Sequence, residues 1–345
     1  MTVSIFGESD PATTGQLVDG SGDFDIPRRV DPGKPPGDRV FSGVARSIGF
    51  FVLVLTGSIG AFLGYQAFPT LRTYGLGFFT GTQFNPELDK VGIGSVLVGT
   101  VEVALIALVI GFPLALLTAL YISEYAPVSW RPTLIAIVDL IAAVPSVLYG
   151  LWGFFFLEPH AIEIARWLSQ HFAWIPLFKV DTDPDAATWS QYAYIGSAFV
   201  AGICVSMMII PMAAAVMRQV FSQAPIGERE AAYALGSTRW GMVRTVVIPF
   251  GRGGIIGGTM LGLGRALGET VAVLLIISPT FDLKIKILSS GTNTVSALIA
   301  ARFGEATGGQ LAALLTAGFV LFVLTLAVNS VAATFVGRSR SGANI

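Results

Sequence analysis

The chain has 345 residues, of which 53% are hydrophobic and only 12% are charged. An average soluble domain carries about 25% charged residues, and a soluble protein as apolar as this one could not cover its own surface. The 21 basic and 22 acidic residues nearly balance, so no basic excess indicates nucleic acid as a partner. Cys204 is the only cysteine, which excludes an intrachain disulfide framework and a cysteine-based metal site. Composition therefore predicts an all-α integral membrane protein.

The start of the chain differs from the rest. Residues 1–46 combine many charges with Gly, Pro, Ser and Asp, and they lack an apolar period. We expect them to form a disordered cytoplasmic tail. No basic segment is followed by a short apolar run, so we expect no cleaved signal peptide. The first apolar run, 47–68, is expected to be a transmembrane helix of the signal-anchor type.

Six apolar runs reach the roughly 20 residues that a helix needs to cross a bilayer. They lie near Ser47–Phe68, Gly94–Ile122, Pro132–Leu157, Tyr192–Met217, Ile255–Ile277 and Leu311–Val336. Pro145 and Gly150 are expected to kink the third of these spans. The stretch 245–277 is too long for one straight span, and Pro249 and Arg252 indicate that its start lies at the membrane interface.

Lysine and arginine are more frequent in the loops on one side of these spans than on the other. The positive-inside rule then places both termini in the cytoplasm, which agrees with an even number of spans. We therefore expect a multi-pass protein of a bacterial plasma membrane, in contact with lipid. The loop Glu158–Gln191 is too interrupted by charges to be a seventh span. We expect an interfacial helix there, with an ordinary amphipathic loop helix as an equal alternative.

Four ionisable side chains remain inside the predicted spans, namely Glu102, Asp139, Arg265 and Glu269. A charge at mid-bilayer costs about 2.5–3.5 kcal/mol on insertion scales, so it is retained where it is paired or lines a pathway. Asp139 lies near the cytoplasmic start of its span, where a helix-terminal or interfacial role and a gating role are equal alternatives. Glu102 lies near the outer end of its span, from which it can simply reach the interface.

Arg265 and Glu269 are four residues apart, so on one helix they share a face. Gly258 and Gly268 fall near that face and would let another helix or a substrate come close. The planar guanidinium of arginine fits an oxyanion through two hydrogen bonds, and Glu269 can neutralise it when no anion is bound. The pair predicts a pathway for an anion. The alternative is a buried ion pair that only braces the helix.

The loop between the fourth and fifth spans reads PIGEREAAYALGSTRWGMVRTVVIPF. It is polar and helix-forming, and Gly236 is expected to end the helix. The loop resembles the segment that marks permease subunits of ATP-binding-cassette (ABC) importers, in which EAA is followed after three residues by Gly and, after nine more, by Ile-x-Leu-Pro. Here Glu230-Ala231-Ala232, Gly236 and the residues 246–249 match that spacing with two conservative aliphatic changes. The alternative is a chance amphipathic loop.

In that family the loop forms a coupling helix that docks in a groove of the ATPase subunit. The resemblance therefore places a coupling helix at about 225–240, with Glu230, Ala231, Ala232 and Gly236 as its contact residues. It also implies the type I importer permease fold, with a permease domain over 94–336 and a cytoplasmic tail over 337–345.

Two further stretches narrow the resemblance. VPSVLYGLWG, starting at Val144, and GLGRALGETVAV, starting at Gly262, are similar to the C-subunit family of phosphate-specific permeases. In that family the arginine and glutamate of GRALGET are implicated in transport, and they fall here on Arg265 and Glu269. The expected substrate pathway consists of Arg265, Glu269, Thr270, Asp139 and Ser146.

The resemblance implies that the chain forms half of a heterodimeric pore with a partner phosphate permease subunit. It further implies two copies of an ATP-binding subunit and an extracytoplasmic phosphate-binding protein. The chain has no GxxxxGK[ST] run, so we expect no enzyme activity, no catalytic or metal-binding residues and no bound cofactor, and we expect a partner ATPase to use ATP and Mg²⁺.

Three alternatives stay open. The substrate could be another oxyanion such as molybdate, tungstate or sulfate, because one arginine does not discriminate among them. The chain could instead be a secondary transporter or channel with a proton-coupled Arg265–Glu269 pair. A mainly regulatory role in phosphate signalling is the third alternative.

Overall fold

The computed structural model describes residues 36–85, 90–180 and 191–340. The chain divides into two compact units, 1–55 and 56–345. The described residues of the first unit belong to α1 (Pro36–Tyr74), a helix that continues into the second. The predicted tail therefore does not reach residue 46, and Asp38 in the first turn favours the earlier helix start because an acidic group there interacts with the helix dipole. The rest of the predicted tail lies outside the described residues.

Four helices in the described part of the chain are long and apolar enough to cross a membrane. Besides α1 they are α3 (Gly94–Leu120) with the π-helical turn η2 (Tyr121–Tyr125), α7 (Ala198–Phe221) and α14 (Gly308–Arg340). There are up to six spans if each of two bent helix pairs counts as one. α14 runs to residue 340, so the first residues of the predicted C-terminal tail, 337–345, are helical.

The first bent pair replaces the continuous helix predicted over Pro132–Leu157. α4 (Arg131–Ala142) and the helical segment Ser146–His171 meet at 86°. Pro145 has no N–H for the carbonyl of Ile141, and the Tyr149 hydroxyl donates to that carbonyl at 2.9 Å instead. The kink predicted at Pro145 is thus a full break in the helix, whereas Gly150 lies inside a regular helix.

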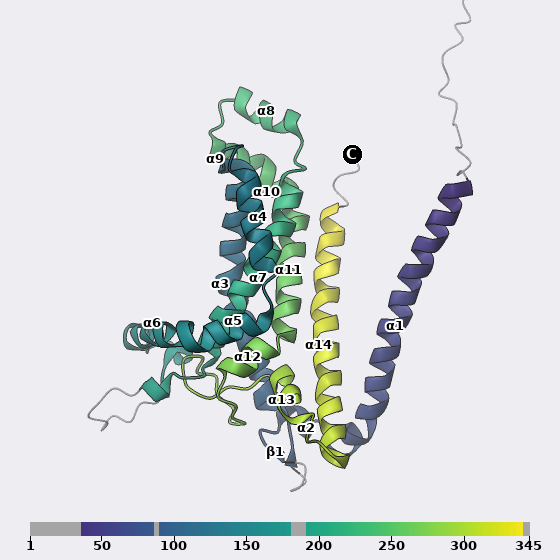
Figure 1. The fold of residues 1–345 in the computed structure, drawn as a ribbon, viewed down its shortest axis with the longest axis vertical. Coiled ribbons are helices and arrows are strands. Elements are labelled where there is room, and N and C mark those ends of the chain that lie inside the picture. The colour runs from purple at the N-terminus through teal and green to yellow at the C-terminus, as the bar shows by residue number, and fades with distance from the viewer. Residues whose placement is uncertain (1–35, 86–89, 181–190, 341–345) are drawn as a thin grey trace, which may run out of the picture. The chain divides into compact units, whose positions relative to one another are not determined.

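The segment after this break consists of α5 (Ser146–Trp152), the π-helical turn η3 (Gly153–Leu157) and α6 (Glu158–His171). In Figure 1, α6 lies across the direction of α3 and α7. The Glu158 carboxylate accepts a hydrogen bond from the backbone N–H of Gly196 at 2.7 Å, which ties the start of α6 to the approach to α7. The loop in which we predicted an interfacial helix therefore does contain a helix.

The second bent pair contains the polar loop and the fifth predicted span. α8 (Ile226–Ala234) precedes α9 (Arg239–Met242), the π-helical turn η6 (Val243–Val247) and α10 (Ile248–Phe250). A bend of 70° then leads into α11 (Arg252–Gly268), so the stretch 245–277 is not one straight span, as we predicted. The span predicted over Ile255–Ile277 is not one helix, because α11 ends at Gly268 and α12 (Val271–Ile276) follows.

The shorter elements lie in the connections. β1 (Phe84–Asn85) pairs antiparallel with β2 (Lys90–Val91), which is a small departure from the all-α prediction. The others are α2 (Gly77–Thr80), α13 (Val295–Arg302) and the 3₁₀ turns η4 (Pro176–Phe178) and η5 (Gln191–Ala193).

α3, α7 and α11 form the core that positions the candidate sites, and α14 runs beside α11 (Figure 1). Glycines let these helices approach closely. A Cβ on Gly202 of α7 would lie 2.5 Å from Cγ2 of Ile106 on α3, and one on Gly258 of α11 would lie 2.9 Å from the carbonyl oxygen of Ala213 on α7. Because lipid tails are as apolar as leucine, helices in a membrane gain from such close packing rather than from hydrophobic burial.

Candidate translocation and coupling sites

Arg265 lies in the last turn of α11, where a cation interacts favourably with the helix dipole. Its Nε atom is buried and has no hydrogen-bond partner. In the described part of the chain no acidic side chain forms an ion pair with it, and it lies within electrostatic range of the Tyr149 hydroxyl on α5. Arg265 as a whole is half-buried, and a guanidinium with an unused donor can bind an anion through two parallel hydrogen bonds.

Glu269 is not on the helix of Arg265, contrary to our prediction. Its backbone is extended, with ψ at 129°, because α11 ends one residue earlier. Its carboxylate is buried and accepts from the N–H of Ala272 at 3.4 Å, so it caps the start of α12. The Ser296 hydroxyl donates to the Glu269 carbonyl at 2.6 Å and stabilises the break between the helices. The shared helix face on which we placed the pair is therefore absent, and no ion pair joins the two side chains in the described part of the chain.

The two sequence stretches that narrowed the family resemblance contact each other in space. A Cβ on Gly150 of α5 would lie 2.8 Å from Cα of Ala272 on α12. A Cβ on Gly153 would lie 2.6 Å from Cδ1 of Ile276. The glycines of the first stretch therefore let α5 lie directly against the helix that follows Glu269.

Tyr149 and Cys204 complete this region, and sequence reasoning had assigned a role to neither. The Cys204 thiol on α7 is fully buried, donates to the Tyr149 carbonyl at 3.3 Å and lies within electrostatic range of Glu269. The sequence feature that could have indicated Tyr149 is its place in the stretch VPSVLYGLWG. Cys204 lies in an ordinary apolar run, and nothing in the sequence singled it out. We call Tyr149, Cys204, Arg265 and Glu269 the arginine cluster.

The remaining predicted pathway residues lie around this cluster with separate contacts. Thr270 follows Glu269 in the helix break, and its hydroxyl donates to the Gly268 carbonyl at 3.1 Å. Ser146 is the half-buried first residue of α5, about one helical turn before Gly150. Asp139 is the exception, because it lies on α4 with its carboxylate 4.0 Å from the Arg218 guanidinium near the end of α7. That pair is partly exposed and contributes little to stability.

Glu102 on α3, which we expected to reach the interface, is half-buried. Its Oε1 atom is buried and has no hydrogen-bond partner. No polar contact connects it with Arg265 in the described residues, so it stays outside the arginine cluster.

An apolar cavity of about 530 Å³ lies between α4, α5 and α7. Its lining includes Val138, Ile141, Leu148, Tyr149 and Met207. Charged side chains are missing from this lining, so the cavity suits an apolar group rather than an anion. Among the described residues, no group of three or more His, Cys, Asp or Glu could hold a metal ion.

The predicted coupling residues lie on and after α8. Glu230 and Ala231 are exposed, whereas Ala232 is buried in a cluster with Ala224, Met242 and Val243. Gly236 has a φ of +82°, a left-handed conformation that favours glycine, so the predicted helix stop is confirmed. Large apolar side chains beside the motif are exposed, namely Ile226, Tyr233, Leu235 and Trp240. One side of α8 thus packs against the rest of the protein. The other side exposes both polar and apolar side chains that a partner could contact.

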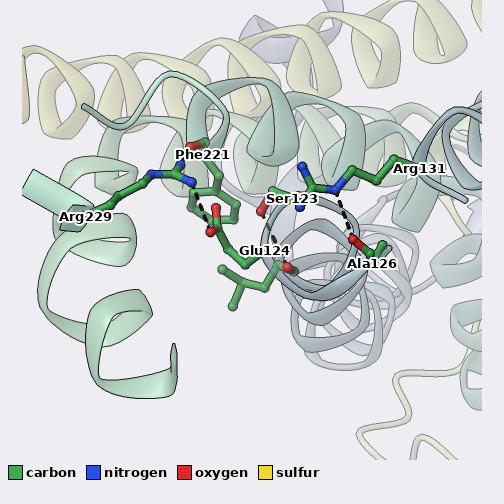
Figure 2. A network of polar contacts seen from close by, with 7 residues as sticks. Ser123, Glu124, Ala126, Arg131, Phe221 and Arg229 are labelled. Carbon is green, nitrogen blue, oxygen red and sulfur yellow. Dashed lines mark hydrogen bonds and ion pairs between the residues drawn. The ribbon is translucent and has the colours of Figure 1, made fainter. Parts of the chain in front are cut away.

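A half-buried arginine attaches α8 to the long helices (Figure 2). The Arg229 guanidinium donates from Nη1 to the Glu124 carboxylate at 3.1 Å and from Nη2 to the Phe221 carbonyl at 2.6 Å. Glu124 belongs to η2, and its side chain is only 4% exposed. Phe221 is the last residue of α7. Sequence reasoning missed both charged residues of this contact.

Comparison with known proteins agrees with this architecture. Residues 111–341 match the family described as binding-protein-dependent transport system inner membrane component. The chain also resembles, with an identity of 18% and a TM-score of 0.50, a crystal structure of a bacterial ABC transporter involved in the import of the acidic polysaccharide alginate. That match covers 87% of this chain and 99% of the other. The chain therefore belongs to the family of binding-protein-dependent inner membrane components, and its fold is that of an ABC importer permease.

Relatives within this family are more specific. The chain is 39% identical to the phosphate transport system permease protein PstC 2 of Mycobacterium bovis, over 89% of this chain and 94% of the relative. It is 39% identical to PstC of Xylella fastidiosa, over 82% and 89% of the two chains. A probable PstC of Methanocaldococcus jannaschii is 36% identical, over 84% and 91%. The chain thus belongs to the PstC group. It is a multi-pass plasma-membrane permease component rather than an enzyme, and a separate subunit hydrolyses ATP.

Proposed function

We propose that this chain is the permease subunit of an ATP-driven importer of inorganic phosphate and forms half of its translocation pore. The observation that carries this proposal is the similarity to PstC permeases, which extends over 89% of the chain at 39% identity. In this proposal a second phosphate permease subunit completes the pore. Two copies of an ATP-binding subunit use ATP and Mg²⁺, and an extracytoplasmic phosphate-binding protein delivers the substrate.

Arg265 is the proposed contact for phosphate inside the membrane. Because no carboxylate of the described residues forms an ion pair with its guanidinium, an incoming anion does not have to displace one of them. A charge left unpaired in a low-dielectric region is costly, and an oxyanion with two acceptor oxygens satisfies it. The absence of a paired acid also counts against the alternative of a proton-coupled Arg265–Glu269 pair.

The neighbouring residues have supporting roles in this proposal. Glu269 caps α12 and thereby fixes the end of α11, so it positions Arg265. Its negative charge repels a bound anion and so limits how long the anion stays at Arg265. Thr270 and Ser146 offer hydroxyl donors at the helix break and at the start of α5. Asp139, held near Arg218, lies at the cytoplasmic side of the pathway, where an acidic group repels phosphate away from the pore.

The motif residues Glu230, Ala231, Ala232 and Gly236 form the proposed contact with the ATPase. Their helix, α8, is attached through Ala232 and leaves Glu230 and Ala231 open to a partner. In this arrangement each bent helix pair counts as one span, so six spans leave both termini in the cytoplasm, on the side of α8. ATP binding turns the pore outward, and hydrolysis returns it inward.

The substitution Arg265→Gln tests the proposed function. We expect it to abolish ATP-driven phosphate uptake into vesicles that contain the complete complex, because the neutral amide cannot compensate an anion. Arg252→Gln, at the exposed first residue of the same helix, is the matched control and should transport normally. Full uptake by Arg265→Gln would contradict the proposed contact.

The same assay separates the alternatives. Competition by molybdate, tungstate or sulfate at concentrations comparable to phosphate would favour another oxyanion as substrate. Uptake that continues without ATP would favour a secondary transporter. A substitution that leaves uptake intact but changes the cell's response to phosphate would favour the regulatory role.

A further inference from the structure

Arg229 connects three separate segments of the chain at one guanidinium. The residue lies on α8, its carboxylate partner Glu124 lies on η2 at the end of α3, and its carbonyl partner Phe221 ends α7. Figure 2 shows the side chain of Arg229 extending from α8 toward Glu124 and Phe221. Both contacts are charge-assisted hydrogen bonds, which are shorter and stronger than neutral ones.

The Glu124 carboxylate is buried, so water could not solvate it if the contact with Arg229 were broken. The Glu124 side chain is 4% exposed, and its Oε1 atom has no hydrogen-bond partner. A buried carboxylate needs a cation, and separating the pair would leave the charge uncompensated. The carboxylate also lies in a π-helical turn, an irregularity that is frequent at functional positions of helices. The ion pair therefore resists separation when α8 moves.

The two helices attached by Arg229 belong to the core that reaches the arginine cluster. α3 and α7 pack against each other along their length, and α7 carries Cys204. Arg229 directly precedes Glu230 of the motif, so a force on the exposed side of α8 acts next to it. A displacement of α8 must either break the ion pair or carry the ends of α3 and α7 with it.

We infer that Arg229 and Glu124 are positioning residues that transmit the movement of α8 to α3 and α7. This inference rests on the proposed function, since it assumes that an ATPase moves α8. It deepens that function by assigning the transfer of force to two residues outside the motif. The pair does not contact the substrate or the nucleotide. Its loss should uncouple ATP hydrolysis from transport without removing the ATPase.

The test uses the complete complex in vesicles with Arg229→Gln, Arg229→Lys and the control Arg131→Gln. Arg131 lies in the same neighbourhood, but its Nε donates to the Ala126 carbonyl at 3.1 Å rather than to a residue that contacts α8 (Figure 2). We expect Arg229→Gln to retain the ATPase and to hydrolyse ATP, while the phosphate imported per ATP falls by about tenfold, within the usual range of coupling between sites. Arg229→Lys keeps the positive charge but loses the planar pair of donors, so its phosphate-to-ATP ratio should lie between those of the wild type and Arg229→Gln. Arg131→Gln should keep the wild-type ratio.

A second readout does not depend on phosphate. Leu148→Cys places a thiol on the exposed part of α5, and we expect ATP to change its rate of labelling by a maleimide in the otherwise unchanged complex but not with Arg229→Gln. An unchanged import-to-ATP ratio in Arg229→Gln would overturn the inference, as would the loss of the ATPase from the purified complex, which would make the pair merely structural. The wild-type complex could fail to import phosphate while ATP still changes the labelling and the change still requires Arg229. That result would overturn the proposed substrate and support the transmission role.

Discussion

Two half-buried arginines, Arg229 and Arg265, have different surroundings, although the Nε atom of each is buried without a hydrogen-bond partner. Arg229 shares its guanidinium between a carboxylate at 3.1 Å and a carbonyl at 2.6 Å. Arg265 forms no ion pair within the described part of the chain, and its nearest acidic neighbour in sequence, Glu269, caps another helix. The same type of side chain therefore has an acidic partner in one region and none among the described residues in the other.

This difference separates two uses of a charge inside a membrane protein. An arginine paired with a buried carboxylate holds segments together, because breaking the contact leaves a buried charge on the partner. An arginine without an acidic partner is costly in the empty state, and an anionic ligand that supplies acceptors removes that cost. Position in the sequence does not distinguish the two, whereas the surroundings of each guanidinium do.

The largest expected effect comes from disturbing the packing beside Arg265. Gly150→Ala should destabilise the protein by about 1–3 kcal/mol, because the new methyl group overlaps the backbone of Ala272, 2.8 Å away, and overpacking has that typical cost. Thermal unfolding of the detergent-solubilised complex measures the change. Gly257→Ala is the control, since no atom lies within 4 Å of its Cβ, and it should stabilise α11 by about 0.5–1 kcal/mol. Equal unfolding temperatures for the two variants would show that α5 and α12 do not touch.

A smaller effect is expected when the charge of Arg265 is kept and its shape is changed. Lysine offers a point charge instead of a planar fork, so Arg265→Lys should retain phosphate uptake at a rate reduced by about tenfold, equivalent to about 1.4 kcal/mol. Initial uptake rates at saturating ATP give the comparison. A rate equal to that of the wild type would mean that Arg265 acts only through its charge, and no uptake at all would show that the fork is indispensable.

The smallest effects concern the two glutamates. Glu124→Gln replaces a charge-assisted bond to Arg229 by a neutral one and should cost about 1 kcal/mol of stability. Glu269→Gln should cost less than about 0.5 kcal/mol, because the amide oxygen can still accept from the N–H of Ala272 and no ion pair is lost. Denaturation of the two variants side by side measures the difference. A larger loss for Glu269→Gln would reveal an ion pair with Arg265 and remove the contrast between the sites.

Much of the fold follows from the sequence, because an apolar run in a bilayer must satisfy its backbone internally and has few options besides a helix. The break at Pro145 was visible as a predicted kink, since proline cannot donate to the helix. The helix stop at Gly236 was visible for a similar local reason. The break at Glu269 was not, because its neighbouring residues are compatible with a helix and its carbonyl is satisfied by Ser296, 27 residues further along the chain.

The same reason explains which parts of the sites were missed. Spacing alone placed Arg265 and Glu269 on one helix face, and a single helix end between them changed the relation. Arg229 and Glu124 are 105 residues apart, so no local pattern connects them. Arg229 stands beside the recognised motif, and Glu124 follows an apolar run, but only their contact in space shows that they form a pair. Tyr149 likewise gained its role from a proline four residues earlier, which cannot donate to the Ile141 carbonyl that the Tyr149 hydroxyl contacts.

The burial of Cys204 has a practical and a physiological consequence. The single thiol of the chain is fully enclosed and lies against the Tyr149 carbonyl, out of contact with water. Oxidants and thiol reagents act on exposed thiolates, so the folded subunit should be inert to them. Phosphate uptake through this pore would then be unaffected by oxidative conditions as far as this chain is concerned. For labelling experiments, a cysteine added to the surface of this chain would be its only accessible thiol. The native sequence can therefore serve as the background without removal of Cys204.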